Sequence, residues 1–169
     1  IQPTCRCLLL SSTMRAIVNG QDFLSSRRIP FEMLEHAPTY TAQNLAQAVH
    51  VPGVEVAKTV LCRVDDELYL AVLPATHQID LMRLSEFLGA DQVDLASEND
   101  CGRYFPDCEL GVLPPFGSKY GMRTLVDRSL LEDEYIVFEG NTHHDAVRML
   151  CSDFVAVEDP IITDFANHV

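Results

Sequence analysis

The spacing of apolar and polar positions predicts a succession of short strands and short helices. Two aliphatic and β-branched runs, residues 54–64 and 68–73, are separated by the acidic segment 65–67. Such a pair of runs around a polar turn predicts a β-hairpin. Further strands are expected over residues 31–36, around Val126 and over residues 135–138.

Capping residues indicate where the helices begin and end. Thr41 and Asp80 precede stretches whose apolar residues recur every three or four positions, and Ser97 with Asp100 forms a capping-box pattern. Gly89 is placed to end the second of these helices. Helices are therefore expected over residues 20–28, 42–49, 81–88 and from residue 97 onward.

A long segment rich in glycine and proline interrupts this pattern at residues 102–121. A loop of this length inside a compact domain is more often functional than idle. The strands and helices alternate without a regular βαβ rhythm, which favours an α+β fold built on a mixed, barrel-like sheet with surrounding helices. No repeat or linker divides the chain, so we expect one domain over residues 14–169.

Composition and charge narrow the classes of function. The chain has 169 residues, with 25 acidic against 12 basic residues and a formal net charge of −13. No apolar run is long enough to span a membrane. An acidic chain is a poor general surface for phosphates, so we expect no DNA or membrane partner and only local contact with nucleic acid. The candidate cations for that contact are Arg27, Arg28, Lys58, Lys119 and Arg123.

The six cysteines form no CxxC pair and have no histidine at zinc-finger spacing. We interpret them as reduced thiols of a cytoplasmic protein and expect no metal and no cofactor. Residues 1–13 contain no methionine, and their apolar run is too short for a secretory signal. Met14 is interpreted as the natural start, with residues 1–13 upstream of the fold.

Lys58 stands among apolar residues in the expected strand 54–64. It is either an edge residue whose ammonium reaches water or a cation held where a polar substrate binds. Residues 108–117 contain two adjacent prolines flanked by glycines. This segment is either a rigid structural turn or a loop that directs backbone N–H groups at an oxygen, as an oxyanion hole does.

Other catalytic patterns are weak or missing. His143 and His144 follow a predicted strand, but no third ligand stands at a suitable spacing for a metal. The sequence has no G-x-S-x-G, P-loop or GxGxxG motif. Nucleophilic-serine and nucleoside-triphosphate chemistries are therefore disfavoured.

A series of short motifs resembles the YbaK and prolyl-tRNA synthetase editing-domain family. In chain order they are Glu35-His36, Thr41-Ala42-Gln43, Val51-Pro52-Gly53, Ala57-Lys58-Thr59-Val60, Val72-Leu73-Pro74-Ala75, Phe105-Pro106-Asp107-Cys108-Glu109, the loop 111–117, Val126-Asp127, Thr142-His143 and Val147-Arg148-Met149. The likeness covers about residues 14–160. The AKTV run together with a GxxxP loop ending in PPFG is fairly specific.

The resemblance implies an aminoacyl-tRNA deacylase that hydrolyses the ester of a mischarged tRNA, either free-standing or appended to a synthetase. We expect a trans-editing hydrolase that uses a positioned water, because an aminoacyl ester is already activated. The resemblance assigns the principal catalytic role to Lys58 and to the loop of Gly111, Val112, Leu113, Pro114 and Pro115. The substrate-binding candidates are His36, Tyr40, Thr59, Phe116, Gly117, Asn141 and His143. The histidines would orient water or the α-amine of the amino acid, unless their role is structural.

The implied partners are the acceptor end of a mischarged tRNA and an aminoacyl-tRNA synthetase. The alternative is a non-catalytic module that binds tRNA acceptor ends, a synthetase or a small amino-acid-like ligand. A single pocket shared by Lys58 and the loop at Gly111, large enough for an aminoacyl adenosine, would favour the enzyme.

Overall fold

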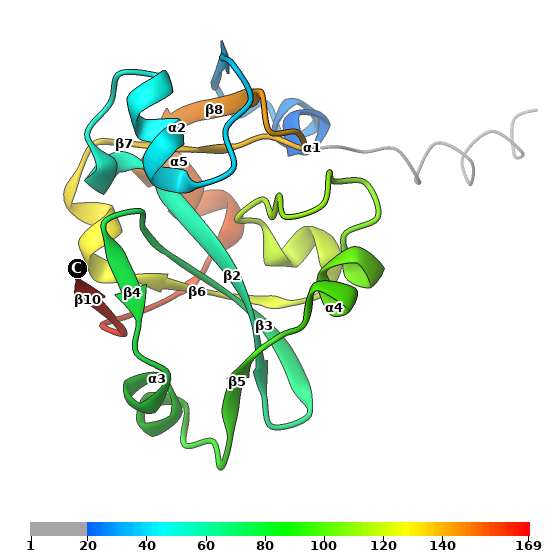
Figure 1. Ribbon diagram of the computed structural model, residues 1–169, viewed down its shortest axis with the longest axis vertical. Helices are drawn as coiled ribbons and strands as arrows, with labels where there is room; N and C mark the ends of the chain where they lie inside the picture. Colours follow the sequence, from blue (N-terminus) through cyan, green and yellow to red (C-terminus); the bar gives the residue numbers. More distant parts are fainter. Residues whose placement is uncertain (1–19) are drawn as a thin grey trace, which may run out of the picture.

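The computed structural model describes residues 20–169, so the expectation for residues 1–13 and for a start at Met14 lies outside the described residues. Two main sheets organise the fold (Figure 1). The larger has the strand order β5-β2-β3-β6-β9, and the smaller has the order β1-β8-β7. A third, two-stranded sheet pairs β10 with β4. The strands are β1 (Glu32–Glu35), β2 (Ala57–Val64), β3 (Glu67–Pro74), β4 (His77–Ile79), β5 (Val93–Leu95), β6 (Arg123–Asp127), β7 (Tyr135–Glu139), β8 (Asp145–Leu150), β9 (Ile161–Thr163) and β10 (Ala166–His168).

Five α-helices and three 3-10 turns surround these sheets in the described part of the chain. The helices are α1 (Gly20–Ser26), α2 (Ala42–Ala48), α3 (Leu81–Leu88), α4 (Glu98–Tyr104) and α5 (Cys151–Glu158). The 3-10 turns are η2 (Gly53–Glu55), η3 (Gly117–Tyr120) and η4 (Arg128–Glu132). The mixed α+β class expected from the sequence is confirmed. Within residues 20–169 the sheets do not close into a barrel, and an isolated parallel bridge between Val56 and Val137 joins the two larger ones.

The β2–β3 hairpin is the centre of the larger sheet. Its strands pair antiparallel from Ala57 opposite Pro74 to Val64 opposite Glu67, as the two apolar runs predict. β3 then pairs parallel with β6, and β6 pairs parallel with β9. Leu70 and Val72 are buried on one face of β3, while Ala71 and Leu73 are buried on the other. The continuous apolar run of β3 therefore reflects a strand covered on both faces.

The main core lies between the two larger sheets. Phe116 is fully buried there, and its ring packs against those of Phe23, Phe138 and Phe154 at centroid distances of 5.1, 5.4 and 5.7 Å. Aromatic rings at such separations add to the stabilisation from burial alone. Phe116 thus joins the long loop after α4 to α1, β7 and α5.

Local capping is as the sequence predicts. The side chains of Thr41, Asp80 and Ser97 accept hydrogen bonds from the first turns of α2, α3 and α4, and Asp100 completes the capping box of α4. Gly89 ends α3 in the left-handed conformation, with φ +63°. The expectation of a strand from residue 54 is wrong for its first residues, because Gly53–Glu55 forms η2 and β2 begins at Ala57.

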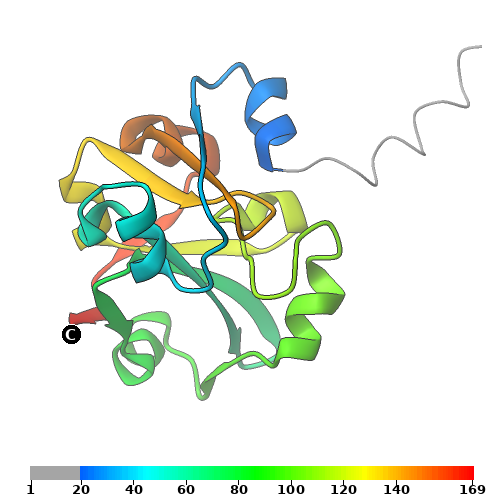
Figure 2. The same ribbon diagram turned by 45° about the horizontal axis from the view of Figure 1, so that its top comes forward.

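The loop after α4 and the turn between β7 and β8 lie side by side, although they are far apart in the sequence (Figure 2). The N–H of Glu109 donates to the carbonyl of Asn141 at 2.9 Å, and the N–H of His143 donates to the carboxylate of Glu109 at 2.9 Å. These bonds fix the loop over one end of β2.

Candidate active site

Lys58 lies near the beginning of β2, opposite Leu73 of β3. β5 pairs only with residues 62–64 of β2, so Lys58 is on the part of the strand that β5 leaves uncovered. Its half-buried ammonium donates a hydrogen bond to the carbonyl of His77 at 2.6 Å. Desolvation by burial lowers the pKa of this lysine. An ammonium group has three N–H donors, so two remain for a ligand after the bond to His77.

The loop 111–115 combines a glycine of positive φ with backbone donors. Gly111 has φ +86°, a conformation that favours glycine. The N–H of Val112 donates to the carbonyl of Glu109 at 3.0 Å. Within residues 20–169, the N–H groups of Gly111 and Leu113 donate to no acceptor. Proline has no N–H, so these two amides are the donors that the segment can offer to a ligand.

Lys58 and the loop line the same cavity, which has a volume of about 290 Å³. Its ten lining residues are Tyr40, Thr41, Ala42, Leu45, Ala57, Lys58, Thr59, Gly111, Leu113 and Glu139. They come from α2 and the segment before it, from β2, from the loop and from the end of β7. A cation and two unpaired amides around one cavity can together stabilise an oxyanion.

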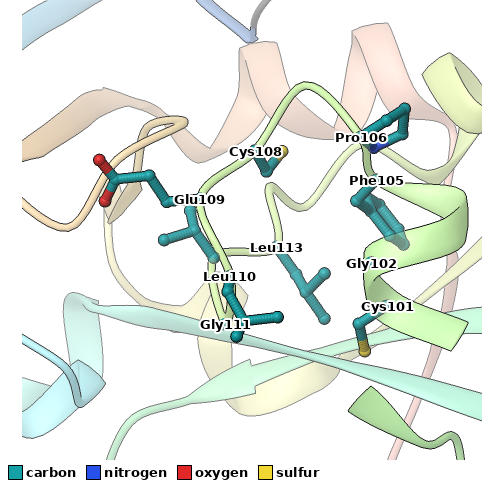
Figure 3. A pocket seen from close by; sticks show the side chains of 10 residues that line it. Cys101, Gly102, Phe105, Pro106, Cys108, Glu109, Leu110, Gly111 and Leu113 are labelled. Carbon is teal, nitrogen blue, oxygen red and sulfur yellow. The ribbon is translucent and has the colours of Figure 1, made fainter. Parts of the chain in front are cut away.

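A second, more apolar hollow of about 440 Å³ adjoins this cavity through Tyr40, Thr59, Gly111 and Leu113. Leu61, Leu95 and Leu110 contribute to its walls. A smaller hollow of about 130 Å³ lies between the loop and α4, and Figure 3 shows Glu109 pointing away from it while Leu113 extends toward α4. Gly111 and Leu113 therefore stand at the junction of all three hollows.

His143 holds the loop and the segment before α2 in place, but it does not itself line the cavity of about 290 Å³. Its Nε2 lies 2.8 Å from the carbonyl oxygen of Leu110, and its Nδ1 lies 3.0 Å from that of Thr39. The ring also packs against Tyr40, with centroids 4.7 Å apart. His143 thus connects the β7–β8 turn to both the loop and the segment before α2, and it borders the apolar hollow.

Glu139 is a cavity residue that the sequence analysis did not identify. It is the last residue of β7, and its side chain is 17% exposed. Burial raises its pKa to about 7, although the nearby His143 opposes the shift. A polar residue ending an apolar strand, four positions before a histidine, is the signal that could have indicated it.

The predicted site residues divide into two groups. Lys58, Thr59, Tyr40, Gly111 and Leu113 line the cavity. His143 does not line it but borders the adjoining apolar hollow. The predicted residues that line neither space are Val112, Pro114, Pro115, Phe116, Gly117, Asn141 and His36. Among them, Gly117 and Asn141 make hydrogen bonds that hold the backbone of the loop.

Gly117, Asn141 and His36 illustrate this second group. The N–H of Gly117 donates to Thr124 Oγ1 at 2.9 Å, and a Cβ on Gly117 would come within 2.5 Å of that oxygen. The amide of Asn141 donates to the carbonyl of Asp107 at 3.2 Å, which holds the start of the loop. His36 Nδ1 lies 2.7 Å from the carbonyl of Ala37, next to its own residue in the chain.

Lys119 is not available to a phosphate, contrary to the expectation from the sequence. Its ammonium pairs with the carboxylate of Asp107 and donates to the hydroxyl of Tyr120, and its side chain is 10% exposed. The hydrogen-bonded group of Lys119, Asp107 and Tyr120 instead holds the base of the loop.

Across residues 20–169, no three histidine, cysteine, aspartate or glutamate side chains cluster so that they could hold a metal ion. None of the helices in the same range is long and apolar enough to cross a bilayer.

The fold and the site together define a small α+β domain with a ligand cavity lined by a lysine and a glycine-proline loop. The sequence profile of the aminoacyl-tRNA editing domain matches residues 36–156. The chain therefore belongs to the aminoacyl-tRNA editing domain family.

Related sequences and structures agree with this assignment. Proline–tRNA ligases of Staphylococcus aureus strains Newman and COL are each 31% identical to the chain over 71 residues. That match covers 42% of this chain and 12% of either ligase. Among solved structures, hypothetical protein APE2540 has a TM-score of 0.79 at 20% identity, covering 87% of this chain and 98% of its own. A protein proposed as a trans-editing enzyme for prolyl tRNA synthetase has a TM-score of 0.76 at 19% identity, covering 94% and 99%. At such identities the structural likenesses show the fold.

Proposed function

We propose that this chain is a trans-editing hydrolase that cleaves the ester of a mischarged aminoacyl-tRNA. The observation that carries the proposal is that Lys58, Gly111 and Leu113 line one cavity, and that within residues 20–169 the N–H groups of Gly111 and Leu113 donate to no acceptor. Membership of the editing-domain family supports the same substrate class. The reaction would take place in the cytoplasm.

The chemistry needs no covalent nucleophile, because an aminoacyl ester is already activated. A water molecule held next to the ester attacks its carbonyl carbon, and negative charge develops on the carbonyl oxygen. The N–H groups of Gly111 and Leu113 and the ammonium of Lys58 stabilise that charge. The bond to the ribose oxygen then breaks, the ribose oxygen takes up a proton from the attacking water, and the amino acid leaves.

The two adjoining hollows suggest how the substrate is divided between them. The cavity of about 290 Å³ next to Lys58 suits an aminoacyl group. The apolar hollow of about 440 Å³ suits the terminal adenosine, with the exposed ring of Tyr40 at the boundary. Ligand pockets are typically of this size and are mostly apolar with a few placed polar groups.

The proposed partners are the acceptor end of a mischarged tRNA and an aminoacyl-tRNA synthetase. Two of the relatives with a named activity are proline–tRNA ligases, so mischarged proline tRNA is the first substrate to test. The acidic surface of the chain favours contact limited to the acceptor end.

The decisive experiment is a deacylation assay on a panel of tRNAs, each charged with a wrong amino acid, starting with proline tRNA. We expect rapid hydrolysis of at least one mischarged species and slow hydrolysis of the correctly charged tRNA. Binding of an acceptor end without turnover of any species would instead support the non-catalytic module.

A further inference from the structure

Glu139 places a carboxyl group in the same cavity as Lys58. The side chain extends from the end of β7 and lines the cavity with Tyr40, Lys58 and Gly111. Lys58 comes from β2 and Gly111 from the loop, so three separate elements bring a cation, two amide donors and a carboxyl group around one small space. Neither the oxyanion role of Lys58 nor that of the loop requires this carboxyl group.

Glu139 also lacks the partners that buried carboxylates of this chain have elsewhere. Glu158 accepts hydrogen bonds from the N–H and hydroxyl of Ser118 and from the hydroxyl of Thr124. Within residues 20–169, no group donates a hydrogen bond to the carboxylate of Glu139. The closest basic group is the imidazole of His143, whose Nδ1 lies 3.9 Å from Oε1 and 3.0 Å from the carbonyl of Thr39.

A largely buried carboxylate without donors is costly unless a ligand supplies a partner. Burial raises the pKa of Glu139 to about 7. A ligand that brings a cation to this position restores the charged form and forms a charge-assisted hydrogen bond. The cavity is therefore better suited to a ligand with a positive group than to a neutral one.

We propose that the carboxylate of Glu139 binds the α-ammonium group of the aminoacyl ester, an inference that rests on the proposed deacylase function. The α-ammonium nitrogen of an aminoacyl ester is two bonds from the carbonyl carbon. With the carbonyl oxygen at Gly111, Leu113 and Lys58, the ammonium is held on the side of the cavity that Glu139 forms. The protein thereby binds both the carbonyl oxygen and the α-ammonium group of the ester.

The contact between Glu139 and the α-ammonium group predicts which esters the protein does not hydrolyse. Acylation of the α-amine removes its positive charge and adds bulk, as in peptidyl-tRNA or N-acetyl-aminoacyl-tRNA. Binding such an ester would leave the carboxylate of Glu139 unpaired, and a site built around a polar contact rejects ligands that lack it. The chain would then hydrolyse esters of free amino acids and leave peptidyl esters intact.

The test compares a mischarged tRNA that the wild-type protein hydrolyses with the same tRNA after N-acetylation. We expect the wild type to prefer the free amine by about tenfold or more in kcat/KM, because a charge-assisted contact is lost on acetylation. Glu139→Gln should lose most of this preference through a higher KM for the free amine. Glu35→Gln, the same change on an exposed residue at the end of β1, should keep it.

Two outcomes of this assay would overturn the inference while leaving the deacylase function in place. The first is equal hydrolysis of the free and N-acetylated esters by the wild type. The second is an equal loss on both esters in Glu139→Gln, which would indicate that Glu139 activates the water instead.

A binding measurement decides the inference if the wild type hydrolyses no ester. The probes are the glycyl amide of 3′-amino-3′-deoxyadenosine, which cannot be hydrolysed as an ester, and its N-acetyl derivative. Calorimetry should show about tenfold tighter binding of the free amine by the wild type and little difference for Glu139→Gln. No preference for the free amine in the wild type would refute the role of Glu139 independently of catalysis.

Discussion

The imidazole of His143 lies 2.8 Å from the carbonyl oxygen of Leu110, which joins the β7–β8 turn to the residue before Gly111. The other ring nitrogen lies 3.0 Å from the carbonyl oxygen of Thr39, one residue before Tyr40. The ring therefore contacts one carbonyl on each of two segments that are distant in the sequence. One side chain thus sets the position of two segments that line the cavity.

We therefore predict that His143→Ala lowers deacylation without unfolding the protein. Net hydrogen-bond contributions are about 1 kcal/mol each, so the domain should stay folded with a modest loss of thermal stability. Displacement of the loop should reduce kcat by about tenfold or more, because small errors in position are costly to catalysis. His144→Ala is the matched control, since His144 is exposed and should tolerate the change. Equal activity of the two variants would contradict the role given to His143.

Removal of the cavity cation should have the largest effect on catalysis. We expect Lys58→Ala to lower kcat on the order of a hundredfold or more, because a group that stabilises developing charge is lost. The far-ultraviolet circular dichroism spectrum should be unchanged. Arg83→Ala, which removes an exposed cation on α3, serves as the control. Near-normal turnover by Lys58→Ala would show that the lysine is structural.

The outcome for individual residues shows which features the sequence can predict. The caps at Thr41, Asp80 and Ser97 depend on bonds to residues three positions away, so they can be recognised locally. The parallel pairing of β3 with β6 joins residues more than fifty positions apart and leaves no local signal. The local pattern singles out Lys58 and the loop 108–117, and the resemblance to a known family assigns them a role.

Glu139 and Phe116 show that a local pattern does not predict which way a side chain faces. Glu139 ends a strand next to a turn, where a polar residue is ordinary. Its place in the same cavity as Lys58 arises from the packing of β7 against β2, which the isolated bridge between Val56 and Val137 marks. Phe116 belongs to the PPFG motif, yet its ring faces the core. A motif can identify a functional segment, but the direction in which each side chain points depends on long-range packing.

The titration of Glu139 should make stability depend on pH. Burial raises its pKa from 4.5 to about 7, so the folded state binds the proton more tightly than the unfolded chain does. The resulting stabilisation is fully present below about pH 4.5 and is lost as the pH rises through about 7. We predict that Tm falls less for Glu139→Gln than for the wild type between pH 5 and pH 8. Parallel Tm curves would show that His143 and Glu109, the charges near Glu139, leave its titration close to that of an exposed glutamate.

Thiol reagents and chelators should leave the deacylation rate unchanged. Burial raises the pKa of Cys62 to about 12 and those of Cys108 and Cys151 to about 11, so these thiols remain protonated and unreactive near pH 7. The activity should survive iodoacetamide and EDTA, and the unfolded protein, which should be alkylated fully, controls for the reagent. Loss of activity with EDTA and recovery with zinc would contradict this prediction and show a metal requirement, although residues 20–169 contain no cluster that could hold a metal ion.

The contact with tRNA should depend only weakly on salt. Lys119 is paired with Asp107, so the expected contacts with the phosphates of the acceptor end are made by Arg27, Arg28 and Arg123. Each phosphate neutralised on a single strand contributes a slope of roughly −0.7 to the plot of log affinity against log salt, so about three contacts give a slope near −2. Filter binding between about 50 and 300 mM salt would measure it, with Arg123→Ala expected to reduce the slope by about one contact. A slope steeper than about −5 would contradict this prediction, because it would require more phosphate contacts than these three arginines can make.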